Sequence, residues 1–556
     1  MRLVLLRPHG AISAFFLLTL LLIAGFNTAL AINCPTSKLP KPTEDFAVTK
    51  AQLEADGLWQ QNRSVPEDPQ LGDTWDWYIW DLTGMPVANL KPCTIRGMGD
   101  NVFVVVDDDE WNVAGMDQDA VDRIVDHFDN QSVGNFPDQG IWDLNTSHFG
   151  DPPNNLDGQE RIFLLYYRFN IAADGFFWVF DQYPDGSQQW ASNEADVIYM
   201  ATDNGEPDGN YMMAVMAHEF EHLIHFNTDQ NEESWVDEGL AELAMWLFGN
   251  PDTISGFNTN TDNRLTNWTG AWADYIKTYL WTLYMYEKYG GQSLIYDVCH
   301  NPLNSMEGYR TSLENLGGAP DMGNIFGDWC MANYLHDSSI GDGRYGYEGE
   351  TLPLFWAWRI HSSSPASGSG TISGWAGESM RLLNLDEPLA ISFDGIDSRE
   401  FRLFVTSKEP GLPTIVDPVV IGDRNEAMFQ HHEGYSEAVL TVANVNSNIS
   451  ASYTYSTEFG LSPVPVADFN KVDLHCHPNP FNPQTELSFR LAEDTQGRVL
   501  IHDSRGHLVQ VLHDGPLGMG DHRFAWNAHG LASGVYFSSL EIDGVISSVR
   551  KLTLVQ

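Results

Sequence analysis

The sequence predicts a multidomain protein in which an α+β domain precedes two small all-β sandwich domains. With 556 residues, the chain is long enough for several domains of about 100–200 residues each. Strand-like runs precede helical ones up to about residue 335. After a stretch rich in serine and glycine at 361–370, β-branched and aromatic residues alternate, which is typical of strands.

Composition indicates a globular protein and excludes some partners. Hydrophobic residues make up 43% of the chain and charged residues 19%. Lys and Arg number 29 against 76 Asp and Glu, a formal net charge of -47, so nucleic acid and anionic membranes are not expected partners. Either a solvated acidic surface or several calcium sites would explain this acidity.

The N-terminus predicts a secreted protein. Arg2 and Arg7 precede an apolar run, FFLLTLLLIAGF, which ends in NTALA, so residues 1–31 read as a signal peptide cleaved after Ala31. An uncleaved anchor is the alternative. Residues 32–72 are polar and contain prolines, which indicates a linker or a short pro-segment. The mature chain is expected to be soluble, because we find no second apolar run of spanning length. We also expect a monomer.

The expected order of elements defines the domains. A first domain, 73–360, is predicted to hold strands at 75–82, 101–109, 161–167 and 196–200 and helices at 119–130, 211–226, 235–248, 273–291 and 325–335. A linker at 361–374, a sandwich at 375–458, a linker at 459–470 and a second sandwich at 471–556 follow.

The stretch AHEFEHLIHF, residues 217–226, carries the chemistry. His218 and His222 are four residues apart on one helix face, so both can reach one tetrahedral zinc ion. Glu219 is adjacent and can reach a water at the metal, as a general base would. The motif is short, and the alternative is a half-exposed helix whose histidines are merely solvated.

A second stretch, ESWVDEGLAELAMWLFG at 233–249, favours the metal site. A hydrolytic zinc site needs a third protein ligand, and Glu238 follows His222 with fifteen residues between them (238 − 222 − 1). Glu242 lies one turn further on the same face, placed to accept a hydrogen bond from a ligating histidine. Burying two glutamates on this apolar helix without a cation would cost several kcal/mol each.

Together these stretches resemble the gluzincin metallopeptidases, particularly the hyicolysin-like branch, over roughly residues 75–340. The resemblance implies a thermolysin-like α+β catalytic domain with His218, His222 and Glu238 as zinc ligands, Glu219 as general base and Glu242 behind the ligands. His225 lacks the spacing of a further ligand, and Asp237 receives no role. Tyr275 and Tyr279, on the helix after the zinc segment, are candidate donors to the oxyanion; core packing is the alternative for both.

The implied activity is that of a secreted zinc endopeptidase acting on proteins or peptides. In that mechanism zinc polarises the scissile carbonyl, and Glu219 takes a proton from water and passes it to the leaving amine. Two other classes stay open. One is a surface adhesin that keeps the metal fold without turnover, and the other is a zinc exopeptidase.

Other candidate features are weaker. The acidic run from Asp107 to Glu110 could bind a structural calcium ion, although a solvated strand end explains it as well. The HCH triplet at 475–477 has no partner cluster. In an oxidising compartment, disulfides Cys34–Cys93 and Cys299–Cys330 are plausible, which leaves Cys476 unpaired.

The C-terminal region is similar to a known targeting module. HPNPFNPQTELSFRL and a late SGVYF resemble the sorting domains of the type IX (Por) secretion pathway and equally the FlgD-type immunoglobulin-like domains. An ordinary accessory β-sandwich is the alternative. The resemblance implies contact with a secretion machinery and a place outside a bacterial cell, either released or on its outer surface.

Overall fold

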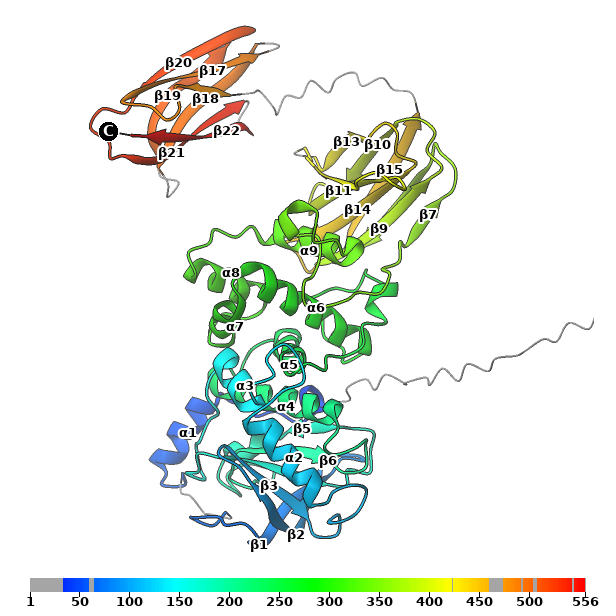
Figure 1. The fold of residues 1–556 in the computed structure, drawn as a ribbon, viewed down its shortest axis with the longest axis vertical. Coiled ribbons are helices and arrows are strands. Elements are labelled where there is room, and N and C mark those ends of the chain that lie inside the picture. The colour runs from blue at the N-terminus through cyan, green and yellow to red at the C-terminus, as the bar shows by residue number, and fades with distance from the viewer. Residues whose placement is uncertain are drawn as a thin grey trace, which may run out of the picture.

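A computed structural model describes residues 34–59, 65–422, 424–459, 474–491, 494–503, 508–542 and 545–555. Figure 1 shows the described chain as a lower part with one sheet, a helical middle part and two further β-rich parts. The predicted signal peptide, residues 1–31, lies outside the described residues. No helix of the described segments is long and apolar enough to cross a membrane.

The first part is built on a six-stranded mixed sheet in the order β1-β2-β3-β4-β6-β5. Its strands are β1 (Thr74–Asp81), β2 (Val87–Met98), β3 (Val102–Asp107), β4 (Ile162–Tyr167), β5 (Gly175–Phe177) and β6 (Val197–Ala201). Strands β3, β4 and β6 run parallel, whereas β5 pairs with β6 in the antiparallel direction at the edge of the sheet. Every residue of β3, β4 and β6 is buried, as expected for parallel strands covered on both faces.

Helices cover this sheet and continue beyond it. They are α1 (Phe46–Ala55), α2 (Gln118–Asp129), α3 (Ile141–Phe149), α4 (Asn210–Thr228), α5 (Ser234–Phe248), α6 (Trp272–Tyr289), α7 (Gly291–Cys299), α8 (Ser305–Asn315) and α9 (Met322–Leu335), with short 3-10 turns η1 (Thr36–Lys38), η2 (Val179–Gln182), η3 (Phe257–Thr259) and η4 (Gly341–Gly343). Helix α2 packs on β2 and β3, and α4 packs on β5 and β6. Helix α5 lies between α4 and α6. Helix α4 itself lies next to β5, the edge strand of the sheet.

A glycine sets the distance between α5 and α6. A Cβ atom on Gly239 would lie 2.6 Å from the hydroxyl oxygen of Thr282 and 3.2 Å from the carbonyl oxygen of Thr278. Any larger residue would therefore push the two helices apart. Helix α5 ends at Gly249, which adopts a left-handed conformation with φ 105°.

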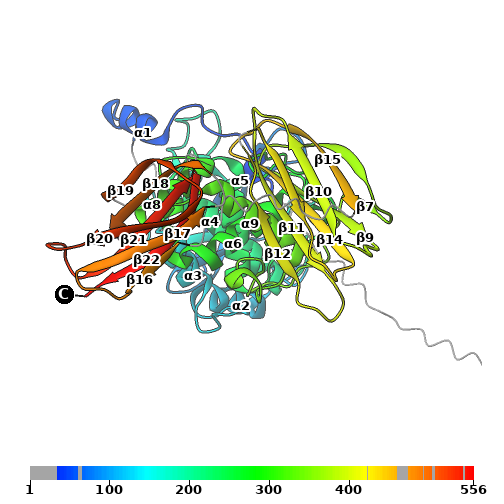
Figure 2. The same cartoon turned by 90° about the horizontal axis from the view of Figure 1, so that it is seen from above.

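Residues 359–459 form two sheets with a common apolar core (Figure 2). One sheet has the order β13-β10-β15-β8 and the other β12-β11-β14-β9-β7. Their strands are β7 (Arg359–His361), β8 (Ser367–Ile372), β9 (Ala376–Leu383), β10 (Leu389–Gly395), β11 (Glu400–Lys408), β12 (Ile415–Val419), β13 (Glu426–Gln430), β14 (Glu437–Val445) and β15 (Ala451–Phe459). The predicted linker at 361–374 is instead partly strand, because β7 and β8 pair with β9 and β15.

The C-terminal part again consists of two sheets around one core, in the orders β16-β17-β20 and β19-β18-β21-β22. The strands are β16 (His475–His477), β17 (Gln484–Leu491), β18 (Thr495–Asp503), β19 (Leu508–Leu517), β20 (Gly520–Asn527), β21 (Gly534–Ile542) and β22 (Val545–Leu554). The HCH triplet is strand β16. Most of the predicted linker at 459–470 lies outside the described residues.

The predicted fold class, a thermolysin-like gluzincin domain followed by two small sandwiches, is wrong. The described residues are organised around five β-sheets, and even the part that carries the histidine motif is built on a six-stranded mixed sheet. The prediction extended a local motif to a whole fold. A five-residue helical motif fixes one turn of helix and the direction of three side chains, but it does not fix the topology around them.

Candidate metal centre

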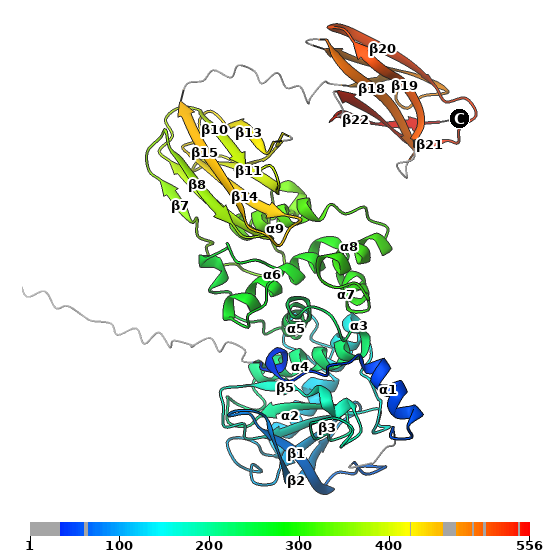
Figure 3. The same ribbon diagram turned by 180° about the vertical axis from the view of Figure 1, so that it is seen from behind.

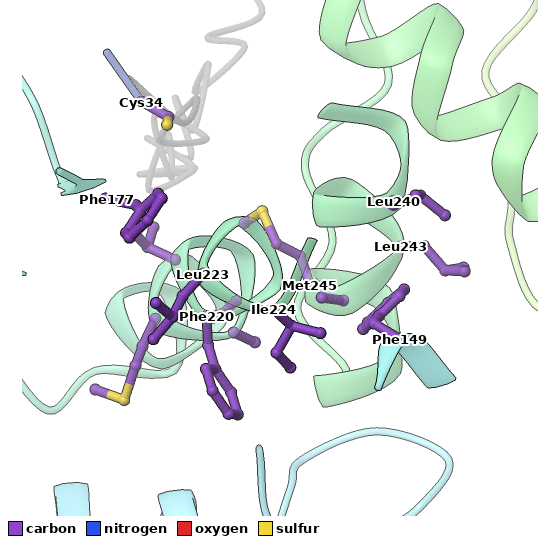
Figure 4. Close-up of a cluster of buried hydrophobic side chains, with 14 of the residues drawn as sticks. Cys34, Phe149, Phe177, Phe220, Leu223, Ile224, Leu240, Leu243 and Met245 are labelled. Carbon is purple, nitrogen blue, oxygen red and sulfur yellow. The ribbon is translucent and has the colours of Figure 1, made fainter. Parts of the chain in front are cut away.

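Helices α4 and α5 form the framework of the site. The α4 residues from Met212 to Phe226 are all buried, because the helix lies between the sheet and α5. Figure 4 shows the apolar side of this packing, with Phe220 and Ile224 on α4 and Leu240 and Leu243 on α5. The polar residues of the motif therefore lie in the buried interior of the protein.

Three of the predicted ligands lie together. The Nε2 atoms of His218 and His222 are 3.2 Å apart. A carboxylate oxygen of Glu238 lies 3.5 Å from His218 Nε2 and 3.9 Å from His222 Nε2. Ligand atoms about 2.1 Å from one tetrahedral ion lie about 3.4 Å from each other, so these spacings fit one small cation.

The structure adds a fourth residue that the sequence did not indicate. Cys34 is fully buried, and its Sγ lies 3.9 Å from His222 Nε2. Cys34, His218, His222 and Glu238 each offer a ligand atom, and these atoms all lie within 4.8 Å of one another. The protein thus contains a buried group of His, Cys and Glu side chains that could hold a metal ion.

The carboxylates of this region fit a cation. Glu238 and Glu242 have no exposed surface, and none of their four carboxylate oxygens has a hydrogen-bond partner among the described residues. Burial raises the pKa of Glu238 to about 7. Buried carboxylates without hydrogen bonds are costly, and a metal ion would remove that cost.

The predicted base, Glu219, points into the same space. One oxygen accepts a hydrogen bond of 3.0 Å from the Thr36 hydroxyl, and this carboxylate also lies next to the Cys34 thiol. Burial raises the pKa of Glu219, and the two motif histidines oppose that rise. A Cβ atom on Gly175 of β5 would lie 3.0 Å from Glu219 Cγ, so this glycine lets the edge strand approach the base closely.

Asp237, which received no role from the sequence, orients the histidines. One of its oxygens lies 3.1 Å from Nδ1 of His222 and 3.1 Å from Nδ1 of His225. This contact turns Nε2 of His222 toward His218 and Glu238, as outer carboxylates do in metal sites. Glu242 lies 3.5 Å from Nδ1 of His218, on the side away from Glu238. Asp237 directly precedes Glu238, and this position next to a predicted ligand was the one feature of the sequence that could have indicated its role.

The two motif histidines differ in their protonation. Burial and the neighbouring His222 lower the pKa of His218 to about 3, so its ring is neutral and offers a lone pair. Burial also disfavours charge on His222, but Asp237 and Glu238 outweigh that effect and raise its pKa to about 10. A cation bound by Glu238 would take over the role of this proton.

Tyr275 and Tyr279 are separated by the structure. The Tyr275 hydroxyl donates a hydrogen bond of 3.0 Å to the backbone carbonyl of Cys34, beside the metal group. The Tyr279 hydroxyl donates instead to Glu350, at 2.5 Å. Of the two predicted oxyanion donors, Tyr275 is therefore the one that reaches the site.

His225 belongs to a second, neighbouring group. Its Nδ1 lies 3.5 Å from a carboxylate oxygen of Glu221, and Glu221, His225 and Cys299 are all buried with ligand atoms within 4.8 Å of one another. Neither oxygen of Glu221 has a hydrogen-bond partner among the residues that the structure describes. His225 thus lies outside the first group and inside another that could also hold a metal ion.

The acidic run from Asp107 to Glu110, at the end of β3, does not support the predicted calcium site. Asp108 accepts hydrogen bonds from Thr94 and Arg96, and Asp109 pairs with Lys91 at 2.5 Å. Glu110 pairs with Arg168 at 3.0 Å. Nearby basic and hydroxyl groups already neutralise or bind these carboxylates, and no metal-binding group in the described part of the chain includes them.

All five cysteines are free, so the predicted pairs Cys34–Cys93 and Cys299–Cys330 are wrong. Cys34 faces His222, whereas Cys93 lies in β2 and its thiol donates to the carbonyl of Lys91. The thiol of Cys299 lies 3.3 Å from the Thr228 hydroxyl. Sequence separation gave no information about these positions.

Comparisons with known proteins do not define a family. No protein-family model and no curated protein matches the chain. The adhesin domain of Epf from Streptococcus pyogenes matches 34% of this chain and 73% of its own, at 12% identity and a TM-score of 0.13. β-Glucuronidase 2 of Bacteroides uniformis matches 34% of this chain and 26% of its own, at 11% identity and a TM-score of 0.12.

A family GH115 4-O-methyl-α-glucuronidase matches 57% of this chain and 54% of its own, at 8% identity and a TM-score of 0.13. TM-scores of this size carry no conclusion about fold or activity. The function therefore has to be argued from the site itself.

Proposed function

We propose that the protein is a zinc-dependent endopeptidase that uses Glu219 as its general base. The observation that carries the proposal is the position of Glu219, a buried carboxylate next to a group of two histidines and a glutamate spaced for one cation. Two imidazoles and a carboxylate are the ligand set that hydrolytic zinc sites use. A purely structural site would not need a further, non-ligating carboxylate beside it.

The side chains have distinct tasks in this proposal. A bound zinc ion would polarise the carbonyl of a peptide bond and lower the pKa of the attacking water. Glu219 accepts the proton of that water and delivers it to the leaving nitrogen. The Tyr275 hydroxyl donates to the oxygen that becomes negative, and Asp237 keeps Nε2 of His222 directed at the site.

We also propose that the enzyme acts outside the cell. The predicted signal peptide and the similarity of residues 471–556 to type IX sorting domains support this placement. Extracellular proteins or peptides are then the substrates, and the secretion machinery is the partner of the C-terminal region. The high negative charge of the chain is compatible with an aqueous, salt-containing environment.

The test is casein hydrolysis by the chain that starts at residue 32, before and after limited trypsin treatment, with the trypsin inhibited before casein is added because trypsin itself cleaves casein. Glu219→Gln serves as the matched variant, with bound zinc quantified in both proteins. The trypsin-treated parent should cleave casein, and the equally treated variant should keep its zinc but lose roughly 10²–10⁴-fold in rate, the usual contribution of a general base. Equal zinc content with no hydrolysis by any form would contradict the peptidase proposal and favour a non-catalytic adhesin. New termini inside casein, identified by mass spectrometry, separate endopeptidase from exopeptidase.

A further inference from the structure

The N-terminal segment, residues 34–59, lies across the candidate metal centre. Figure 3 shows it in dark blue, running from η1 beside α4 and β5 to α1 at the side of the sheet part. Phe46, the first residue of α1, packs its ring against Tyr183 and Phe226 at centroid distances of 5.1 and 5.2 Å. The segment is therefore docked on the same elements that build the site.

Cys34 begins this segment and reaches the ligands. Figure 4 shows it next to Phe177 of β5, above helix α4. Its sulfur lies 3.9 Å from Nε2 of His222, and its side chain has no exposed surface. A thiolate is a strong zinc ligand, and it would complete a tetrahedral set with two imidazoles and one carboxylate.

A second observation points to a cation at this place independently of the cysteine. Glu238 has no exposed surface, neither of its oxygens has a hydrogen-bond partner in the described structure, and one oxygen faces His218 at 3.5 Å. Cys34 therefore joins a group whose buried carboxylate is available to bind a cation.

The residues after Cys34 occupy the other functional groups. The hydroxyl of Thr36 donates to Glu219 and accepts a hydrogen bond of 3.0 Å from the backbone N–H of Phe177 on the edge strand. The backbone carbonyl of Cys34 accepts from Tyr275. Base, edge strand and oxyanion donor are thus all bound to one short stretch of the chain.

Further contacts hold this stretch from the other side of the site. The indole N–H of Trp268 donates to the Ser37 hydroxyl at 3.2 Å, and the ammonium of Lys38 donates to the carbonyl of Gly270 at 3.3 Å. Both partners lie in the loop that leads into α6. A cavity of about 330 Å³ remains between the segment, β5 and the end of α4, lined by Leu39, Phe177 and Phe226 among others.

We propose that Cys34 is the fourth ligand of the metal ion and that residues 34–59 keep the site closed to substrate until they are removed. On coordination the thiol releases its proton to solvent and the sulfur bonds the metal; no oxidant or reductant takes part. The sulfur then holds the position that a hydrolytic site must leave open for water. The closed state rests on the proposed peptidase function, whereas the ligand assignment rests only on the metal group.

The test uses cobalt(II) in place of the native metal, because a thiolate bound to cobalt absorbs strongly in the near ultraviolet. The chain starting at residue 32, loaded with one cobalt ion, should show this band. Cys34→Ser should keep the cobalt through His218, His222 and Glu238 but lose the band. Cys299→Ser, which removes the thiol of the neighbouring group, is the matched control and should keep it.

Hydrolysis gives the second readout. Cys34→Ser, or trypsin cleavage after Lys38, should raise the rate of casein hydrolysis roughly tenfold or more, equivalent to about 1.4 kcal/mol of competing binding. Thr36→Val frees Glu219 without touching the sulfur, so its band should remain. If Cys34→Ser does not fold, the band of the parent chain and its persistence in Cys299→Ser still test the ligand assignment, because these are the two thiols in the metal groups of the described residues.

Three results would overturn the ligand assignment: no band in the parent chain, a band that survives in Cys34→Ser, or a band lost in Cys299→Ser instead. The two proposals fail separately. A band that depends on Cys34, with no hydrolysis by any form, keeps the ligand and rejects the peptidase. Hydrolysis by the trypsin-treated chain, with no band in the untreated chain, keeps the peptidase and rejects the ligand.

Discussion

The α4–α5 helix pair and the two-sheet region at residues 359–459 both bury carboxylates, but they bury them differently. In the sheets, Glu378 accepts a hydrogen bond from the hydroxyl of Tyr453, and Ser379 and Thr441 share a hydrogen bond of 2.8 Å. In the helix pair, the oxygens of Glu238 and Glu242 have no such partners within the part of the chain that the structure describes. Hydrogen-bonded buried polar groups are typical of a structural role, whereas buried carboxylates without hydrogen bonds form a group that could hold a metal ion.

The largest expected difference between the two regions is their response to metal. Zinc at about 1,000 times its dissociation constant should stabilise the sheet-and-helix part by about 4 kcal/mol, because only the folded state brings the ligands together. Residues 359–459 should not respond. Differential scanning calorimetry of the metal-free and zinc-loaded chain checks this, since separate transitions should shift by different amounts. Equal shifts of all transitions would contradict the expectation that zinc stabilises the part with α4 and α5 but not residues 359–459.

The reverse perturbation should affect stability without affecting metal. Leu440 of β14 is 2% exposed in the core of the two-sheet region. Leu440→Ala should lower the free energy of unfolding of that region by about 2–5 kcal/mol, because it leaves a cavity. Zinc affinity, measured by competition with a chelating dye, should stay unchanged. A parallel loss of affinity would mean that the two regions are coupled.

A smaller effect is expected behind the metal ligands. Glu242→Gln keeps the shape of the side chain but removes the negative charge 3.5 Å from Nδ1 of His218. Zinc affinity should fall about 10- to 100-fold, the usual effect of losing an outer carboxylate. Isothermal titration measures this loss. Ser379→Ala, which removes a hydroxyl from the two-sheet region, is the control and should leave zinc affinity unaffected.

The smallest effect concerns pH. Burial raises the pKa of Glu378 to about 7, so the folded state binds a proton that the unfolded state has already released. This contribution to the free energy of unfolding is complete below the pKa of the unfolded state and is lost as pH rises through about 7. Between about pH 6 and about pH 8 the free energy of unfolding should fall by about 1.4 kcal/mol. Glu378→Gln should remove that slope from urea denaturation curves measured at both pH values. If the free energy of unfolding of the variant still falls between the two pH values, another titrating group causes the change.

The sequence predicted local elements better than their assembly. The helix expected at 211–226 is α4, Asn210–Thr228, because its apolar residues repeat with a clear helical period. Strand β2 was missed since Lys91, Pro92 and Gly97 interrupt its pattern, and β5 because it spans only three residues. The fold class was predicted wrongly because a motif carries no information about sheet order.

For the candidate site, the spacing of residues along a helix could be interpreted from the sequence, whereas contacts between residues far apart in the chain could not. His218, His222, Glu219, Glu238 and Glu242 lie on two adjacent helices, and the structure brings all five into one region. Cys34 lies 188 residues before His222, and no periodicity connects them. Residues 32–72 were expected to be a linker or a pro-segment, and only the structure shows that their first part reaches the site.

The missing side chain of Gly239 has a mechanical consequence. Glu238 and Tyr275 lie on helices α5 and α6, and the separation of these helices is fixed where Gly239 faces Thr278 and Thr282. A single added methyl group would thus act as a wedge directly beside Glu238 and less than one helical turn, about 4.5 Å of rise, from Glu242. The absence of a Cβ atom at Gly239 thus allows the close approach of α5 and α6 that brings Tyr275 near the site.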